Sequence, residues 1–156
     1  MVSAGAKAIL DLPRTLEMLE TLSVPVIGYQ CDEFPAFYSR SSGLRVPARA
    51  ESPAEIAAIM TARWRLSPRG GILVANPIPA AHEIPATEID GQIAQAQREA
   101  AARGISGKEV TPFLLARIRD LTGGASQRAN VALVLNNARL AGQIAYAFST
   151  STNRRT

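Results

Sequence analysis

Residues 2–29 read VSAGAKAILDLPRTLEMLETLSVPVIGY, and this stretch predicts a strand, a helix and a second strand in succession. Val2 to Ala4 form a very short expected strand. Asp11 is the expected N-cap of a helix over Leu12 to Leu22, in which leucines recur at helical spacing. Val24 to Tyr29 are expected to form a buried strand. Such a unit indicates a parallel sheet with helices packed on it.

The rest of the chain extends this unit and then becomes rich in helices. Gln30 to Glu51 contain prolines and a glycine without a clear period, so a long loop with one short extended piece is expected there. The expected elements that follow are a helix over Pro53 to Leu66, a strand over Ile72 to Ala75, and helices over Ala86 to Arg103, Thr111 to Leu121 and Ser126 to Phe148. The predicted fold class is α/β, with helices packed on a short, mostly parallel sheet that is half of an α/β/α sandwich, and with a helix-rich C-terminal part.

Composition and charge exclude several classes of protein. The chain has 156 residues and an apolar fraction of 47%, so one domain with a folded core is expected. The 17 basic and 13 acidic residues leave a net charge of +4, which is too small to indicate a nucleic-acid partner. No apolar run approaches the roughly 20 residues that span a membrane. The single Cys31 and single His82 allow neither an internal disulfide nor a zinc-ligand pattern, which favours a cytoplasmic protein.

Seven motifs occur along the chain in a fixed order. They are Ala4-Gly5-Ala6-Lys7-x-Ile9-Leu10-Asp11, residues 25–38 (PVIGYQCDEFPAFY), Ser41-Ser42-Gly43, Asn76-Pro77-Ile78-Pro79, Thr111-Pro112-Phe113-Leu114-Leu115, Thr122-Gly123-Gly124-x-Ser126-x-x-x-Asn130 and Asn136-Asn137-Ala138. Together they resemble the pseudouridine-5′-phosphate glycosidase family, also called the indigoidine synthase A-like family. The resemblance covers residues 1–148 as the C-terminal half of such a domain, and residues 149–156 are expected to form a flexible tail.

The resemblance implies an activity and two site residues. Enzymes of the family reversibly cleave the C–C glycosidic bond of pseudouridine 5′-phosphate to uracil and ribose 5-phosphate, and they use a divalent metal, usually manganese. Lys7 matches the family lysine that forms an imine with C1′ of the ribose, and Asn130 matches an active-site asparagine that binds substrate. The family's metal ligand has no counterpart in this chain. Family members are oligomers, usually trimers, so a homo-oligomer is also expected.

The chemistry of the reaction independently favours a lysine as the catalytic residue. A carbon leaving group needs an electron sink, and an amine that holds the sugar as a protonated imine supplies one. Lys7 follows the end of the first expected strand, where desolvation would lower the pKa of its amine and leave it neutral part of the time. The carboxyl ends of parallel strands are also where open α/β sheets bind ligands.

Other candidate residues have a structural interpretation that is more common than a functional one. Asp32 and Glu33 form a carboxylate pair that could supply a general acid and base, but hydrogen-bond acceptors that stabilise the loop are somewhat more common. His82 is expected to be an exposed residue of a proline-rich linker. Cys31 is expected to be a buried, inert thiol, and Trp64 a residue of the core.

The resemblance also implies that part of the site lies outside this chain. Family members are roughly twice as long, a size at which single domains commonly reach their limit. Their N-terminal half supplies the glutamate acid, the metal-binding aspartate and most phosphate contacts. We therefore expect the chain to need a missing N-terminal half or other subunits for activity on a small phosphorylated sugar or nucleotide. The alternatives are a non-catalytic remnant or regulatory subunit of the family, or a different imine-forming lyase that acts on another sugar phosphate.

Overall fold

A single parallel sheet forms the centre of the molecule. The computed structural model describes residues 1–6, 10–66 and 70–153, and within these residues four strands pair in the order β1-β4-β2-β3. The strands are β1 (Val2–Ser3), β4 (Leu73–Ala75), β2 (Val26–Tyr29) and β3 (Ala48–Ala50), and every pairing is parallel. The predicted α/β class with a short parallel sheet is confirmed. The expected strands of 24–29 and 72–75 begin slightly later than their sequences indicated.

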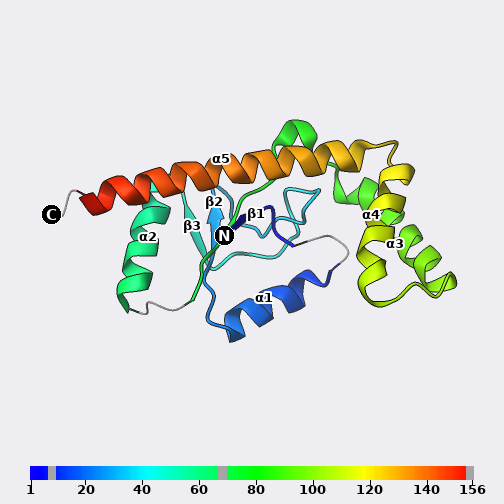
Figure 1. Cartoon of the computed structure of the whole chain (residues 1–156), viewed down its shortest axis with the longest axis horizontal. Coiled ribbons are helices and arrows are strands. Elements are labelled where there is room, and N and C mark those ends of the chain that lie inside the picture. The colour runs from blue at the N-terminus through cyan, green and yellow to red at the C-terminus, as the bar shows by residue number, and fades with distance from the viewer. Residues whose placement is uncertain (7–9, 67–69, 154–156) are drawn as a thin grey trace.

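Helices cover the sheet on both faces and extend beyond one end of it (Figure 1). The helices are α1 (Leu12–Thr21), α2 (Pro53–Leu66), α3 (Ala86–Ala102), α4 (Val110–Leu121) and α5 (Ala125–Asn153), with short 3-10 turns at Ala80–His82 and Gly107–Glu109. Helix α1 packs on one face of the sheet, whereas α2 and α5 pack on the other. Helices α3 and α4 lie beyond the sheet and pack against the first turns of α5.

Alternation along the strands produces these two layers. Val26 and Leu73 are buried against the leucines of α1, while the next residues, Ile27 and Val74, are buried against α2 and α5. Successive side chains of a strand point to opposite faces of a sheet, so continuous apolar strands are buried on both sides. A third cluster, which includes Ile93 and Ile118, joins α3 and α4 to α5.

Two of the helices begin at side-chain caps, of which the one at Asp11 was predicted from the sequence. The Asp11 carboxylate accepts a hydrogen bond of 3.0 Å from the Arg14 amide, which is one of the unpaired amides of the first turn of α1. The Ser52 hydroxyl accepts a 3.2 Å bond from the Glu55 amide, and the Glu55 carboxylate reaches back to the Glu51 amide at 2.8 Å. This reciprocal arrangement closely resembles a capping box.

Helix α5 continues beyond its expected end at Phe148 to Asn153. Hydroxyls of the polar segment bond back to the preceding turn: Ser149 and Thr150 donate to the Tyr146 carbonyl at 2.9 and 3.0 Å, and Ser151 donates to the Phe148 carbonyl at 2.8 Å. Because these side chains bond within the helix, the polar residues do not end it. The first part of the expected tail is therefore helical.

The end of β1 depends on a glycine. Gly5 has φ +82°, and a Cβ added to it would lie 1.7 Å from the carbonyl oxygen of Pro35. Its backbone also bridges to Ala36, which brings the loop after β2 against the residues that follow β1. Only a residue without a side chain fits both the positive φ and this close approach.

We therefore expect Gly5→Ala to be strongly destabilising. The strained φ and the overlap with Pro35 should together lower the free energy of unfolding by at least about 2 kcal/mol. Urea denaturation followed by circular dichroism measures this change. Gly91→Ala in α3 is the matched control, since a Cβ there meets nothing within 4 Å and should stabilise the helix by about 0.5–1 kcal/mol. Equal effects of the two substitutions would contradict this account of β1.

Candidate active site

The carboxyl ends of the four described strands lie along one edge of the sheet. β1 leads to Gly5, β4 to Asn76, β2 to Gln30 and β3 to Glu51. Ligands of open α/β sheets bind outside this edge, because loops from several strands meet there. The candidate site is therefore built from the loops at this edge.

The loop after β2 fixes the end of β1. The Ala4 carbonyl accepts a 2.9 Å hydrogen bond from the Phe37 amide, and the Ser3 carbonyl accepts a 2.8 Å bond from the Asn76 amide. Phe37 adopts φ 64°, a left-handed conformation that is costly for a bulky side chain and is typical of functional segments. Lys7, the predicted nucleophile, lies outside the described residues, two positions beyond Gly5.

A buried amide pair ties the end of β4 to α5. The Asn76 side chain, only 5% exposed, donates a 3.0 Å hydrogen bond from Nδ2 to Oδ1 of Asn137. Asn136 donates to the Pro77 carbonyl at 3.2 Å and strengthens the same connection. Buried amides need such partners, so these bonds hold α5 at a defined position over the strand ends.

Asn130, the second predicted site residue, lies in a small pocket on α5. The pocket has a volume of about 250 Å³, and it is lined by Tyr38, Leu115, Ala116, Arg119, Ser126, Gln127 and Asn130. Tyr38 is buried and is in hydrogen-bond contact with Ser126, whose hydroxyl lies 3.1 Å from that of Thr122. Burial raises the pKa of the Tyr38 phenol, and the bond with Ser126 partly opposes this.

Tyr38 connects this pocket to the end of β1. Its side chain belongs to the same buried cluster as Ala4 and as Ala129, the neighbour of Asn130. The structure therefore places Ala4 and Ala129, one described residue from each of the two motifs, in the same buried cluster. Tyr38 and Ser126 were not singled out from the sequence, although both occur in motifs of the resemblance.

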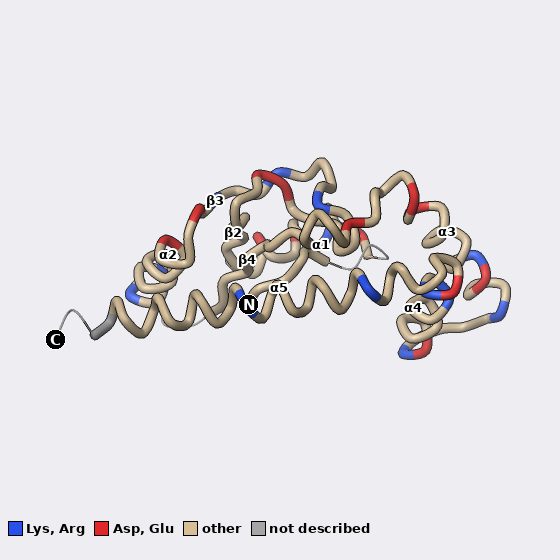
Figure 2. Tube along the Cα trace, turned by 90° about the horizontal axis from the view of Figure 1, so that it is seen from above, with Lys and Arg blue, Asp and Glu red and all other residues tan. Residues whose placement is uncertain are grey.

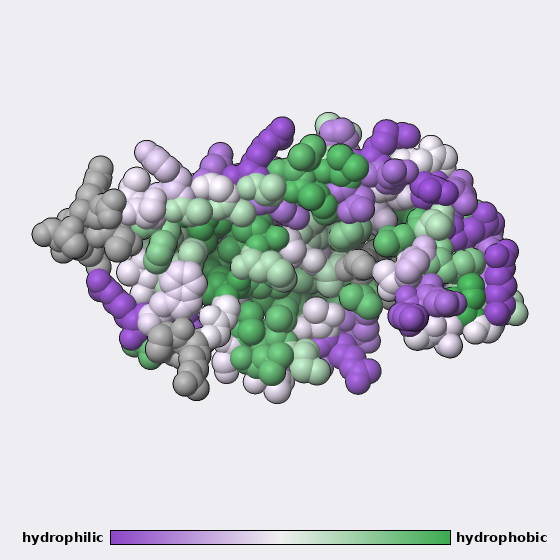
Figure 3. All heavy atoms as spheres, in the orientation of Figure 1, coloured by the Kyte–Doolittle hydropathy of each residue, from purple (hydrophilic) through white to green (hydrophobic). Residues whose placement is uncertain are grey.

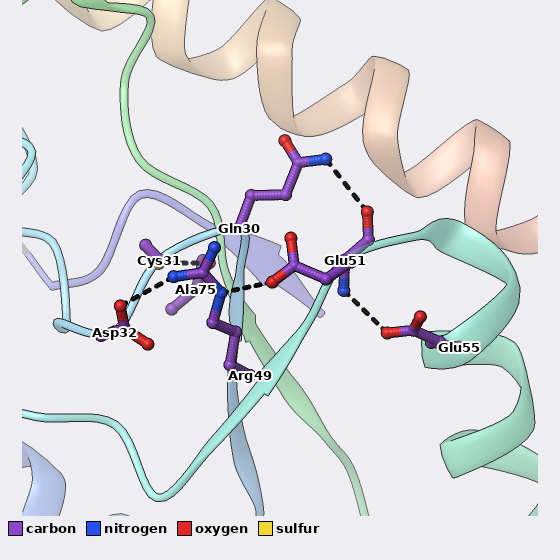
Figure 4. Close-up of polar contacts among 7 residues, drawn as sticks. All are labelled: Gln30, Cys31, Asp32, Arg49, Glu51, Glu55 and Ala75. Atoms are coloured by element: carbon purple, nitrogen blue, oxygen red, sulfur yellow. Dashed lines mark hydrogen bonds and ion pairs between the residues drawn. The ribbon is translucent and has the colours of Figure 1, made fainter.

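Charged side chains at the ends of β2 and β3 bond mainly to one another (Figure 4). Arg49 contacts Asp32 at 2.7 Å and Glu51 at 2.5 Å, and Gln30 donates to the Glu51 carbonyl at 3.0 Å. The Glu33 carboxylate accepts hydrogen bonds from the Ser41 hydroxyl and the Gly43 amide, which lower its pKa. Asp32 and Glu33 are thus acceptors that stabilise the loop, as the commoner interpretation predicted.

The remaining sequence candidates also have defined places in the structure. His82 is exposed. Trp64 was expected in the core, but it is 36% exposed and packs edge-to-face on Phe148, so that expectation is wrong. Cys31 is partly buried, with its sulfur 3.7 Å from the Ala75 carbonyl.

The described residues do not form a metal centre. Nowhere in residues 1–6, 10–66 and 70–153 do three His, Cys, Asp or Glu side chains lie close enough together to hold a metal ion. The donor set therefore does not fit a complete manganese site. Over the same residues, no helix combines the length and apolar character needed to cross a membrane.

A parallel sheet with helices on both faces defines an α/β protein, a class whose ligands usually bind beside the carboxyl ends of the strands. The chain belongs to the indigoidine synthase A-like protein family, whose sequence model matches residues 1–147. A protein of Nocardioides named pseudouridine-5′-phosphate glycosidase is 61% identical over 145 residues, and one of Methylobacterium nodulans with the same name is 62% identical over 147 residues. These matches cover 93% and 94% of this chain but 47% and 44% of the relatives, so the chain spans about half their length.

Solved structures show the same fold. The prealnumycin C-glycosynthase AlnA, in complex with ribulose 5-phosphate, superposes with a TM-score of 0.90 at 33% identity. The superposition covers 99% of this chain and 51% of the AlnA chain. An indigoidine synthase A-like protein of Thermotoga maritima gives a TM-score of 0.83 at 42% identity, over 96% of this chain and 48% of the Thermotoga chain. The arrangement of elements described above is therefore that of half of the family fold.

The amide pair between β4 and α5 is open to a direct test. Asn137→Ala should lower the free energy of unfolding by about 1–3 kcal/mol, because it leaves the buried Nδ2 of Asn76 without its acceptor. Asn137→Asp keeps an oxygen at that position and should cost clearly less. Chemical denaturation of the two variants measures the difference, and equal losses would show that the hydrogen bond is not what holds α5.

The Cys31 thiol offers a test of the electrostatics at the same edge. Burial is the largest influence and raises the pKa of this thiol, whereas the positive charge of Arg49 lowers it. Since the thiolate is the reactive form, alkylation by iodoacetamide should have a pH midpoint above that of an exposed cysteine. Arg49→Gln removes the favourable charge and should move the midpoint further upward.

Lys108→Gln serves as the control, since Lys108 is an exposed residue of the turn before α4 and is not among the groups that shift the Cys31 pKa. A midpoint that falls in the Arg49 variant would contradict this assignment.

Proposed function

We propose that this chain provides part of a pseudouridine-5′-phosphate glycosidase, which cleaves the C–C bond between uracil and ribose 5-phosphate. The observation that carries the proposal is its identity of about 60% with relatives of that name over almost the whole chain. The related C-glycosynthase complexed with ribulose 5-phosphate supports a phosphorylated pentose as the kind of ligand.

Lys7 is the proposed nucleophile. Its amine forms a bond to C1′ of the ribose as the ring oxygen leaves and takes up a proton. The nitrogen lone pair then displaces the C5 carbon of uracil, which is protonated, and the sugar remains as a protonated imine on Lys7. Water hydrolyses the imine, which releases ribose 5-phosphate and regenerates the amine. The fixed end of β1 supports this role, because a nucleophile must be held close to the carbon that it attacks.

Asn130 is the proposed contact to the substrate. The pocket around it presents amide and hydroxyl groups from Gln127, Ser126 and Tyr38, while the charge of Arg119 is offset by Asp120 at 2.9 Å. Such neutral hydrogen-bonding groups suit an uncharged base such as uracil better than a phosphate. The phosphate contacts and the ligands for manganese are accordingly proposed to come from the other half of the family fold.

A cytoplasmic homo-oligomer is the proposed state of the complete enzyme. Helix α5 exposes Val131, Leu135 and Tyr146 on its outer side, with 55%, 52% and 73% of each residue accessible. Apolar side chains at this helical spacing are typical of helices that pack on a partner. The single free cysteine, Cys31, is compatible with a reducing compartment.

Trapping of the imine tests the proposal. The chain contains only two lysines, Lys7 and Lys108, so the site of an adduct is easily assigned. After incubation with ribose 5-phosphate and borohydride, we expect mass spectrometry to find one reduced sugar phosphate on Lys7. The Lys108→Arg variant should give the same adduct, and Lys7→Arg should give none.

The experiment is performed with the chain alone and with the missing half supplied by co-expression. An adduct that is absent under both conditions, or that persists on Lys108 or the amino terminus in the Lys7→Arg variant, would refute the proposed nucleophile. It would favour a non-catalytic subunit instead.

A further inference from the structure

The β1 edge of the sheet has backbone groups that no described strand uses. β1 lies at the end of the strand order and pairs with β4, where the Val74 amide donates to the Met1 carbonyl and the Asn76 amide to the Ser3 carbonyl, both at 2.8 Å. Because successive peptide groups of a strand point to opposite sides, the amide and carbonyl of Val2 point away from β4. Open edges of this kind can pair with a further strand.

An apolar hollow lies directly beside this edge. It has a volume of about 250 Å³, and its lining residues include Met1, Val2, Trp64, Ala141, Ile144 and Ala145. The hollow is walled by β1, α2 and α5, and apolar surface extends over the middle of the face that Figure 3 presents. Among the described residues that line it, none is Lys, Arg, Asp or Glu.

Helix α5 continues the apolar surface along the same side. Val134 and Ala138 precede Ala141 and Ala145 at spacings that place all four on one side of a helix, and all four are exposed. The helix carries only two charged residues over its length, Arg128 and Arg139 (Figure 2). A surface helix with so few charges is typical of one that is covered in the complete protein.

The length of the relatives indicates what covers this face. About half of each solved relative superposes on this chain, so each relative contains a second half of similar length that has no counterpart here. We propose that the β1-edge face, defined by Val2, Val134, Ala138, Ala141 and Ala145, docks the remaining half of the family fold, with a strand of that half pairing along Val2. The inference rests on the proposed function, because it names the partner that completes the same active site.

The position of the face agrees with this occupant. β1 leads directly into the segment that carries Lys7, so a strand added parallel to β1 beside Val2 would bring its own carboxyl end to the same edge of the sheet from which that segment starts. The acid and the metal ligands that the resemblance assigns to the other half would then enter the site from the neighbouring strand. The outer residues of α5 that lie further round the helix, Leu135 and Tyr146, stay free for contacts between copies.

Co-expression tests the docking face. The probe is a polypeptide that carries the half of the Nocardioides relative that this chain does not match, and the complex is purified through a tag on this chain. Light scattering after size-exclusion chromatography should give the mass of a complex that contains the two polypeptides in equal numbers. Ala141→Glu with Ala145→Glu should weaken the pairing at least about tenfold, because two carboxylates would be desolvated in an apolar interface.

The matched control is Ala58→Glu with Ala62→Glu, which adds the same charges at the same spacing on exposed positions of α2. This variant should bind within about twofold of the unmodified chain. Thermal unfolding of both variants by circular dichroism separates loss of binding from loss of fold.

Three results would overturn the proposal: no complex with the unmodified chain, a complex that both double variants weaken equally, or a homo-oligomer that the Ala141 and Ala145 substitutions dissociate while the probe fails to bind. A complex that depends on this face but traps no imine on Lys7 would refute the proposed function and leave the docking face intact. If the imine is trapped on Lys7 but substitutions in the face do not weaken the complex, the docking face is refuted and the proposed function stands.

Discussion

The contact between Gly5 and the Pro35 carbonyl is the constraint on which the candidate site depends. A two-residue strand has little pairing of its own, so the position of its end must come from elsewhere. The close backbone approach at Gly5, the Phe37 amide bound to Ala4 and the Asn76 amide bound to Ser3 supply it. Together they turn a short edge strand into a fixed support for the segment that carries Lys7.

Helix α5 connects the parts of the molecule. Its inner side packs on the sheet through Leu140 and Ile144, and its first turns pack on α3 and α4 through Ala129 and Leu133. Asn130 therefore lies on the same helix that Asn137 joins to the end of β4. A single long helix in this position sets the geometry between two motifs that are far apart in the sequence.

Arginine–carboxylate pairs stabilise contacts between neighbouring elements in two parts of the structure. Arg49 and Arg117 bind carboxylates on neighbouring elements, the latter with two bonds of 2.8 and 2.9 Å to Glu99 that join α3 to α4. These pairs stabilise loops and helix contacts. In the Asn130 pocket, the charge of Arg119 is offset by Asp120, so the lining is close to neutral. Under the proposed function, the phosphate of the substrate would need positive charge from outside this pocket, which agrees with the proposal of a site shared between two halves.

The sequence by itself determined the helices, the parallel sheet and the family, because helix caps, apolar periodicity and ordered motifs are local features of the chain. It also favoured Asp32 and Glu33 as acceptors in the loop over a role as general acid and base. It did not indicate Tyr38 and Ser126 as walls of one pocket or Asn76 and Asn137 as a buried pair, nor that α5 extends to Asn153. Those contacts join residues distant in sequence, and only the packing of α5 across the sheet brings them within bonding distance. The open edge beside Val2 is likewise a property of strand order, which local sequence does not specify.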